Sequence, residues 1–176
     1  NRFTDSVGKT TLLFDNLRGR TPVNYRVSAG FNFRLKNGKT IRPALSFNGN
    51  TNYNFTNNEE NKTLFRSYAA GLSFGQYKPK KFRSNLTISP SYTINRSSLQ
   101  SGINNNGFVL NGTGLAILYL PAKFQIQNNI RYTYNQATDY FQDDFSQLIW
   151  NASVARKFLK NESLSLSASM KDLLNQ

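Results

Sequence analysis

Apolar and polar residues alternate along most of the chain. In the clearest run, residues 23–35, apolar side chains take the odd positions, and polar side chains or glycine take the even ones. Successive side chains of a strand point to opposite faces, whereas a helix repeats every 3.6 residues. This run therefore predicts a strand with one apolar face and one polar face.

Seven further runs alternate in the same way, and none shows a convincing helical period. The predicted strands cover residues 23–35, 41–55, 67–75, 82–95, 108–119, 124–135, 147–158 and 163–170. Short connections around 36–39, 77–81, 121–123 and 159–162 alternate with longer polar ones around 56–61, 97–106 and 136–144. This arrangement is typical of an up-and-down meander with its short turns at one end. We therefore expect an all-β antiparallel meander of about eight long strands in one domain, residues 23–176, with residues 1–22 as a surface loop or the tail of a preceding strand.

The first short turn tests the register of the predicted sheet. A two-residue loop at Asn37-Gly38 would pair Phe33 with Arg42 and mix the two faces. A three-residue loop that starts at Lys36 pairs Phe33 with Ile41 and keeps the faces apart. We therefore predict the three-residue loop, with Gly38 in the left-handed conformation.

Alternation alone does not say which face meets water, but three features favour a transmembrane barrel with its apolar face toward lipid. The polar face is rich in Asn, Ser, Gln and Thr, where a water-exposed sheet usually carries Lys and Glu. Eight of the nine acidic residues fall outside the predicted strands, and Asp172 falls at the end of the last one. Aromatic residues recur near both strand ends, as in interfacial girdles. The predicted lipid-facing girdle includes Phe33, Phe74, Phe82, Tyr119, Phe124, Trp150 and Phe158.

Composition excludes several classes of function. The chain has no Cys and no His, which removes disulfides, thiolate zinc sites and His-dependent triads. Its net charge of +13 permits nucleic-acid binding. However, Lys residues concentrate in the turns and the aromatic residues lie opposite most strand arginines, so we expect no nucleic-acid partner. Asp139, Asp143 and Asp144 share one loop, which we interpret as a solvated surface loop rather than a calcium or glycosidase site. We expect no enzyme activity, cofactor or metal.

The C-terminal part of the chain also carries family-like motifs. They are the Leu120-Pro121 turn before Phe124, Trp150-Asn151-Ala152-Ser153, Lys157-Phe158, Leu164-Ser165-Leu166-Ser167 and Asp172-Leu173-Leu174-Asn175-Gln176. Over about residues 107–176 the chain resembles the Bacteroidetes outer-membrane β-barrel family related to TonB-dependent receptors. The resemblance implies an outer-membrane location, a plug domain, a barrel of about 22 strands, and either energised import or an unassigned outer-membrane role. The implied partners are the lipid bilayer and lipopolysaccharide, the remaining barrel strands and plug, and a periplasmic energy-coupling protein.

The chain departs from that family because it has no plug, no TonB-box segment and no final strand with a terminal aromatic residue. With eight strands, both chain ends fall on the long-loop side, so we expect a piece of a larger barrel. Two alternatives stay open. One is a self-contained eight-stranded outer-membrane barrel with an adhesive or structural role, and the other is a soluble β-barrel that binds an apolar ligand. The transported substrate is left open.

Five arginines fall on the predicted polar face, which a membrane barrel turns toward its lumen. They are Arg26, Arg34, Arg42, Arg83 and Arg131. The predicted register makes Arg34 and Arg42 diagonal neighbours, with no carboxylate on the strands beside them. Like charges this close repel unless something negative compensates. We expect carboxylates from other barrel strands or a plug in preference to an anionic solute.

Overall fold

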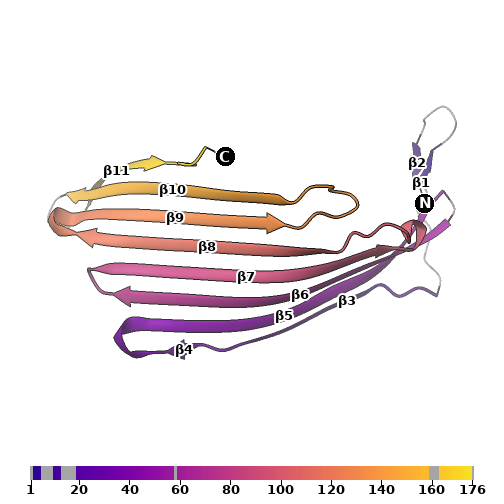
Figure 1. Ribbon diagram of the computed structural model, residues 1–176, viewed down its shortest axis with the longest axis horizontal. Coiled ribbons are helices and arrows are strands. Elements are labelled where there is room, and N and C mark those ends of the chain that lie inside the picture. The colour runs from indigo at the N-terminus through magenta and orange to yellow at the C-terminus, as the bar shows by residue number, and fades with distance from the viewer. Residues whose placement is uncertain (1, 5–9, 13–18, 58, 159–162, 176) are drawn as a thin grey trace.

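The computed structural model describes residues 2–4, 10–12, 19–57, 59–158 and 163–175, and these form one eleven-stranded sheet (Figure 1). The strands are β1 (Arg2–Thr4), β2 (Thr10–Leu12), β3 (Val23–Gly30), β4 (Phe33–Arg34), β5 (Lys39–Thr56), β6 (Glu59–Lys78), β7 (Phe82–Ser97), β8 (Gly107–Leu120), β9 (Phe124–Asn135), β10 (Phe145–Phe158) and β11 (Leu164–Met170). Three single-turn 3₁₀ helices lie at Lys36–Gly38, Ser98–Gln100 and Pro121–Lys123. Within the described ranges no helix is long and apolar enough to cross a membrane.

From β5 to β11 each strand pairs antiparallel with the next strand along the chain, and β3 and β4 both pair with β5. The predicted fold class, an all-β up-and-down meander, is confirmed. β1 and β2 form a separate hairpin, joined to the sheet by one parallel pair between Arg2 and Thr56. This hairpin belongs to residues 1–22, the predicted loop or tail, of which residues 1, 5–9 and 13–18 lie outside the described residues.

The first predicted strand is divided, which the alternation did not indicate. β3 ends at Gly30 and β4 begins at Phe33, with Phe31 opposite Pro43 of β5. The Phe31 amide donates to the Pro43 carbonyl at 3.0 Å, but Pro43 has no N–H to return the bond. The ladder therefore stops for two residues. The register is the same on both sides of the break, because Ala29 pairs with Leu45 and Phe33 with Ile41.

The first short turn has the predicted three residues. Phe33 pairs with Ile41 and Arg34 with Thr40, which confirms the register expected from the sequence. Gly38 is left-handed as predicted, with a φ of 68°, and Asn37 is left-handed as well, with a φ of 63°. Asn tolerates this conformation better than most residues with a side chain.

The connection between the second and third predicted strands is shorter than expected. The sequence predicted a long polar loop over residues 56–61, but β5 continues to Thr56 and β6 starts at Glu59. Glu59 and Glu60 pair with Thr56 and Phe55, so they belong to the ladder and not to a loop. Polar residues are compatible with a strand when both faces of a hairpin extend into water. In Figure 1, β5, β6 and β7 accordingly reach beyond the ends of β8, β9 and β10.

Strand pairing assigns each residue to a face of the sheet and corrects one predicted girdle residue. Tyr119 of β8 pairs with Gln125 of β9, which places it on the polar face instead of the lipid-facing girdle. The apolar neighbours Leu115 and Ile117 share that face, because they pair with Asn129 and Gln127. Residues 115–120 are all apolar, so no alternation shows which of them share a face. Only their pairing with β7 and β9 assigns their faces.

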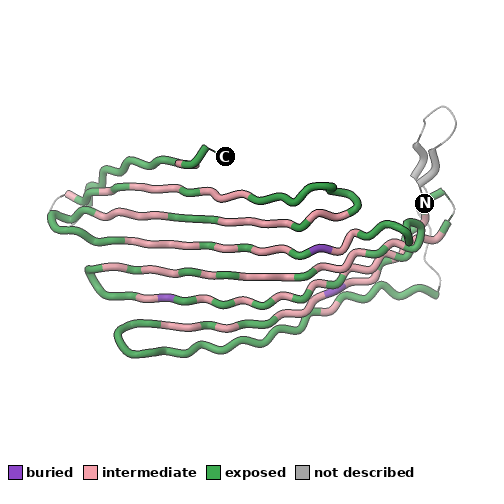
Figure 2. The backbone as a smooth tube through the Cα atoms, viewed as in Figure 1, coloured by how far each residue is buried: buried purple, intermediate pink, exposed green. Residues whose placement is uncertain are grey.

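Along β6 and β7 the apolar face is the more exposed one, which is the reverse of a water-exposed sheet, and Figure 2 shows exposed and half-buried residues alternating along β6. Along β6, Tyr68, Leu72 and Phe74 of the apolar face are exposed, whereas Ser67 and Ser73 of the polar face are half-buried. No hydrophobic side chain of the described residues is buried. The three buried residues among them are glycines, at positions 49, 75 and 107. Along these strands the polar side chains are therefore covered more closely by their neighbours than the apolar ones.

The turn between β8 and β9 contains avoidable strain. Ala122 has a φ of 55° in the turn that corresponds to Lys36–Gly38, and a Cβ in this region costs about 1–2 kcal/mol. We expect Ala122→Gly to raise the free energy of unfolding by about 0.5–1 kcal/mol, after the extra chain entropy of glycine is counted. Denaturant titration of the refolded protein measures it. Ala116→Gly, in the extended part of β8, should instead lower the free energy of unfolding. If both variants are less stable than the parent protein, the turn at Ala122 is not strained.

Candidate functional site: the polar face and the loop end of the sheet

All five predicted lumen arginines lie on the polar face. One cross-strand row contains Arg42 of β5, Ser73 of β6, Thr87 of β7, Thr113 of β8 and Arg131 of β9. The other three belong to the same face by their pairing: Arg26 with Asn48, Arg34 with Thr40, and Arg83 with Tyr77. The alternation in the sequence therefore placed each of them correctly relative to the neighbouring strands.

Arg42 crosses a neighbouring strand to reach its partner. Its Nη2 donates to Oδ1 of Asn85 on β7 at 3.1 Å, although β6 lies between β5 and β7. The path passes Gly75 of β6, where an added Cβ would lie 2.7 Å from Oγ1 of Thr40 and 3.4 Å from Oδ1 of Asn85. Glycine thus leaves room for this contact. Sequence analysis did not single out Gly75 or Asn85, because neither stands out within an alternating run.

A small hydrogen-bonded network continues from Asn85. Its Nδ2 donates to Oγ1 of Thr87 at 3.3 Å, and the Thr87 and Ser73 hydroxyls lie 2.9 Å apart. The network contains the Arg42 charge but no carboxylate. Arg34 and Arg42 are diagonal neighbours across β4 and β5, as predicted, since Arg34 pairs with Thr40, two residues before Arg42. In the described part of the chain, no ion pair is formed by any of the five lumen arginines.

The other predicted girdle residues keep to the apolar face. Strand pairing places Phe33, Phe74, Phe82, Phe124, Trp150 and Phe158 there. Cations accompany several of them at the short-turn end: the Arg156 guanidinium lies 5.0 Å from the ring centre of Phe124 and 4.9 Å from that of Phe158. Lys78 Nζ lies 5.7 Å from the ring centre of Phe82. A cation within about 6 Å of a ring centre is attracted to the face of the ring.

A second aromatic row crosses the same face nearer the loop end. Phe47, Tyr68, Tyr92 and Phe108 occupy successive strands from β5 to β8 in one row. The ring centres of Phe47 and Tyr68 are 4.8 Å apart, within the range of favourable aromatic pairs. Phe47 and Phe108 were absent from the predicted aromatic bands. The sequence shows both residues as apolar positions of alternating runs, but only the register aligns them with Tyr68 and Tyr92.

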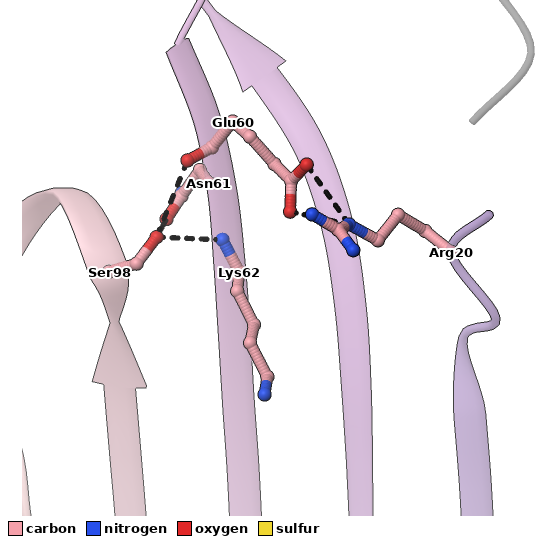
Figure 3. Close-up of polar contacts among 5 residues, drawn as sticks. All are labelled: Arg20, Glu60, Asn61, Lys62 and Ser98. Carbon is pink, nitrogen blue, oxygen red and sulfur yellow. Dashed lines mark hydrogen bonds and ion pairs between the residues drawn. The ribbon is translucent and has the colours of Figure 1, made fainter. Parts of the chain in front are cut away.

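At the loop end, polar contacts join segments that are far apart in the sequence (Figure 3). Nε of Arg20 lies 2.9 Å and 3.1 Å from the two carboxylate oxygens of Glu60. Oγ of Ser98 accepts a bond from the Lys62 amide at 2.9 Å, and Oγ of Ser97 donates to Oδ1 of Asn61 at 2.8 Å. These contacts fasten the β7–β8 connection to β6. Since the Arg20–Glu60 pair is largely exposed, it contributes little to stability.

The loop between β9 and β10 is also built around its carboxylates. Oδ2 of Asp139 accepts a hydrogen bond from the Asn104 amide of the neighbouring loop, and the Tyr140 hydroxyl donates to Oε1 of Gln100. Asp144 accepts from the Ala137 amide at 2.6 Å and from the Tyr134 hydroxyl at 2.8 Å. Two of the three clustered aspartates therefore serve as hydrogen-bond acceptors that shape the loop.

The Asp144 contacts make a titration measurable. The Ala137 amide, followed by the Tyr134 hydroxyl, lowers the pKa of the Asp144 carboxyl in the folded loop. A lowered pKa stabilises the loop above the unfolded-state value of about 3.9, and this contribution is lost as the pH falls through the folded-state pKa. We expect the Ala137 amide chemical shift to titrate with a midpoint below 3.9. The same shift should stay flat in Asp144→Asn, and a midpoint above 3.9 would contradict the contact.

The described residues contain no group of three or more acidic, His or Cys side chains that could hold a metal ion. The described residues form a long polar face that carries arginines, an apolar face with rows of aromatic residues, and a loop end held together by polar contacts. Comparison with family models, curated proteins and solved structures finds no match to this chain. Function is therefore argued from the faces of the sheet alone.

Proposed function

We propose that this chain forms the wall and surface loops of a segment of an outer-membrane β-barrel, in a transporter similar to TonB-dependent receptors, and that it is not catalytic. The observation that carries the proposal is the reversed exposure of the two faces. Leu45, Leu72 and Ile88 expose 65%, 53% and 46% of their surface, whereas polar neighbours such as Ser46, Ser73 and Thr87 are half-buried. Lipid is the solvent that suits such an outer face.

Strand length supports the same proposal. β5 to β8 contain 14 to 20 residues, and β9 and β10 contain 12 and 14. A tilted strand needs about 9–11 residues to cross the hydrocarbon core, while strands of globular proteins average about 5–6. The additional residues suit strands that extend past the membrane on the loop side. On this proposal, the unpaired lumen arginines face carboxylates of a plug or of other barrel strands.

A test of sidedness uses two single cysteines in a chain that has none of its own. Gly102 lies in the loop between β7 and β8, and an added Cβ there meets no atom within 4 Å. Lys80 lies in the short turn between β6 and β7. We expect a membrane-impermeant maleimide to label Gly102→Cys on intact cells, and Lys80→Cys only after lysis. Labelling of Lys80→Cys alone on intact cells would reverse the topology. A protein that stays in solution without detergent and is labelled at both sites would favour the soluble barrel.

The self-contained eight-stranded barrel makes a different prediction for the sheet edges. If β11 pairs with β3 to close the barrel, a cysteine at Ser28 should crosslink to one at Ser165, Ser167 or Ser169. All four serines lie on the polar face. In a larger barrel these edges are far apart and no disulfide forms. Crosslinking in the membrane-inserted protein therefore separates the two membrane proposals.

A further inference from the structure

Three cations interrupt the apolar face near the loop end. Lys62 and Arg66 of β6 and Arg96 of β7 all lie on this face, and each is exposed. Arg96 pairs with Leu64, so it is the diagonal neighbour of both Lys62 and Arg66. Diagonal neighbours in a sheet are about 7–8 Å apart, within reach of long side chains that share one ligand. We call these three residues the loop-end cationic patch.

Nearby carboxylates do not neutralise the patch. Glu60 is on the same face, but both of its oxygens bind Nε of Arg20. Figure 3 shows the Glu60 carboxylate turned toward Arg20, while the Lys62 side chain extends away from it along β6. Glu59 lies on the opposite face. Among the residues that the structure describes, no carboxylate forms an ion pair with the three patch cations.

A recess adjoins the patch. It has a volume of about 500 Å³ and is lined by Lys62, Leu64 and Arg96 of the apolar face, by Asn95 and Ser97 of the polar face, and by loop residues that include Ser98 and Ile103. Its walls thus combine two cations, two apolar side chains and several hydrogen-bonding groups. A site of this size and composition suits an anionic headgroup attached to an apolar chain.

We propose that the loop-end cationic patch binds the phosphate-bearing headgroup of an anionic lipid in the leaflet on the loop side. This proposal rests on the proposed function, which turns the apolar face toward lipid. Arg96 and Arg66 present planar forks that match phosphate oxygens, and Lys62 adds a point charge. Cations near the membrane interface keep their charge in water while their stems lie on apolar surface. In the proposed orientation this face contacts lipid, so a lipid phosphate is the anion that we assign to the patch.

Native mass spectrometry of the full chain in detergent micelles tests the proposal with phosphatidic acid as the probe and phosphatidylcholine as the reference lipid. We expect phosphatidic acid to bind more tightly. The double variant Arg66→Gln/Arg96→Gln should weaken it by about twenty-five-fold, since each basic residue near a lipid surface contributes about a factor of five. The matched variant Arg83→Gln/Arg131→Gln removes two charges from the polar face and should change binding by less than about two-fold.

Each other outcome has a defined meaning. If both double variants lose affinity for phosphatidic acid equally, net charge explains the binding and the proposed patch is wrong. If millimolar inorganic phosphate displaces the lipid, the patch is a site for free anions. If the double variant does not fold, the single variant Lys62→Gln replaces it, and we expect its affinity for phosphatidic acid to fall by about five-fold. Insertion into pure phosphatidylcholine vesicles tests the proposed function separately. A protein that inserts there but shows no preference for phosphatidic acid refutes only the lipid site.

Discussion

Replacing Ile88 with Arg should prevent stable insertion of the protein into a bilayer. Ile88 lies in the middle of β7, between Leu72 of β6 and Gly112 of β8, and almost half of its surface is exposed on the apolar face. If that face meets lipid, an arginine near the bilayer centre costs about 2–4 kcal/mol. Such a cost is a large fraction of the stability of most proteins. Folding into phosphatidylcholine vesicles, followed by guanidinium titration, measures it.

The matched control is the next residue along the strand. Ser89 lies on the polar face, opposite Asn111. Ser89→Arg adds the same charge at the same depth, but toward the lumen. We expect it to change stability by no more than about 0.5 kcal/mol. If both arginine variants insert equally well, the apolar face is not the lipid-facing one.

Among the glycines that lie within strands, Gly49→Ala should be the most damaging methyl addition. A Cβ at Gly49 would lie 2.8 Å from the Phe65 carbonyl oxygen and 2.7 Å from Cζ of Tyr25. The carbonyl belongs to the backbone of β6 and cannot move without disturbing the ladder. The Tyr25 ring lies against Gly49 and also pairs with Phe47, with ring centres 5.1 Å apart. Overpacking of this kind costs about 1–3 kcal/mol, and we expect that loss in the free energy of unfolding.

The same substitution elsewhere on this face should have the opposite sign. At Gly114 of β8 an added Cβ would meet Cβ of Ile130 at 3.8 Å and Cδ1 of Leu86 at 3.9 Å, which is ordinary contact. Gly114→Ala should therefore gain about 0.5–1 kcal/mol, because glycine loses more chain entropy in a strand. Denaturant titration of both variants in one lipid mixture compares them. If Gly49→Ala raised the free energy of unfolding, the Tyr25 ring and the β6 backbone would have to move aside at little cost.

The sequence by itself determined most of the strands, the faces of the clearly alternating runs, and the first turn. Each side chain in a strand alternates between two environments, so a period of two identifies both the strand and its faces without knowledge of its neighbours. That is why Arg26 and Arg34 were placed on the polar face, and why Phe33 was paired with Ile41 through the three-residue turn. Turn residues add local information, since few residues adopt the left-handed conformation of Asn37 and Gly38.

Only the tertiary structure decided which residues are neighbours across strands. Tyr119 lies in an all-apolar run whose pattern has no phase, so its face followed from pairing with Gln125. The division between β3 and β4 depends on Pro43, which lies in another strand and lacks the N–H that this edge needs. The contact between Arg42 and Asn85 joins residues 43 positions apart across Gly75, and the loop-end cationic patch joins β6 to β7. Such contacts depend on register, which is set jointly by the turns and by the pairing along the whole ladder.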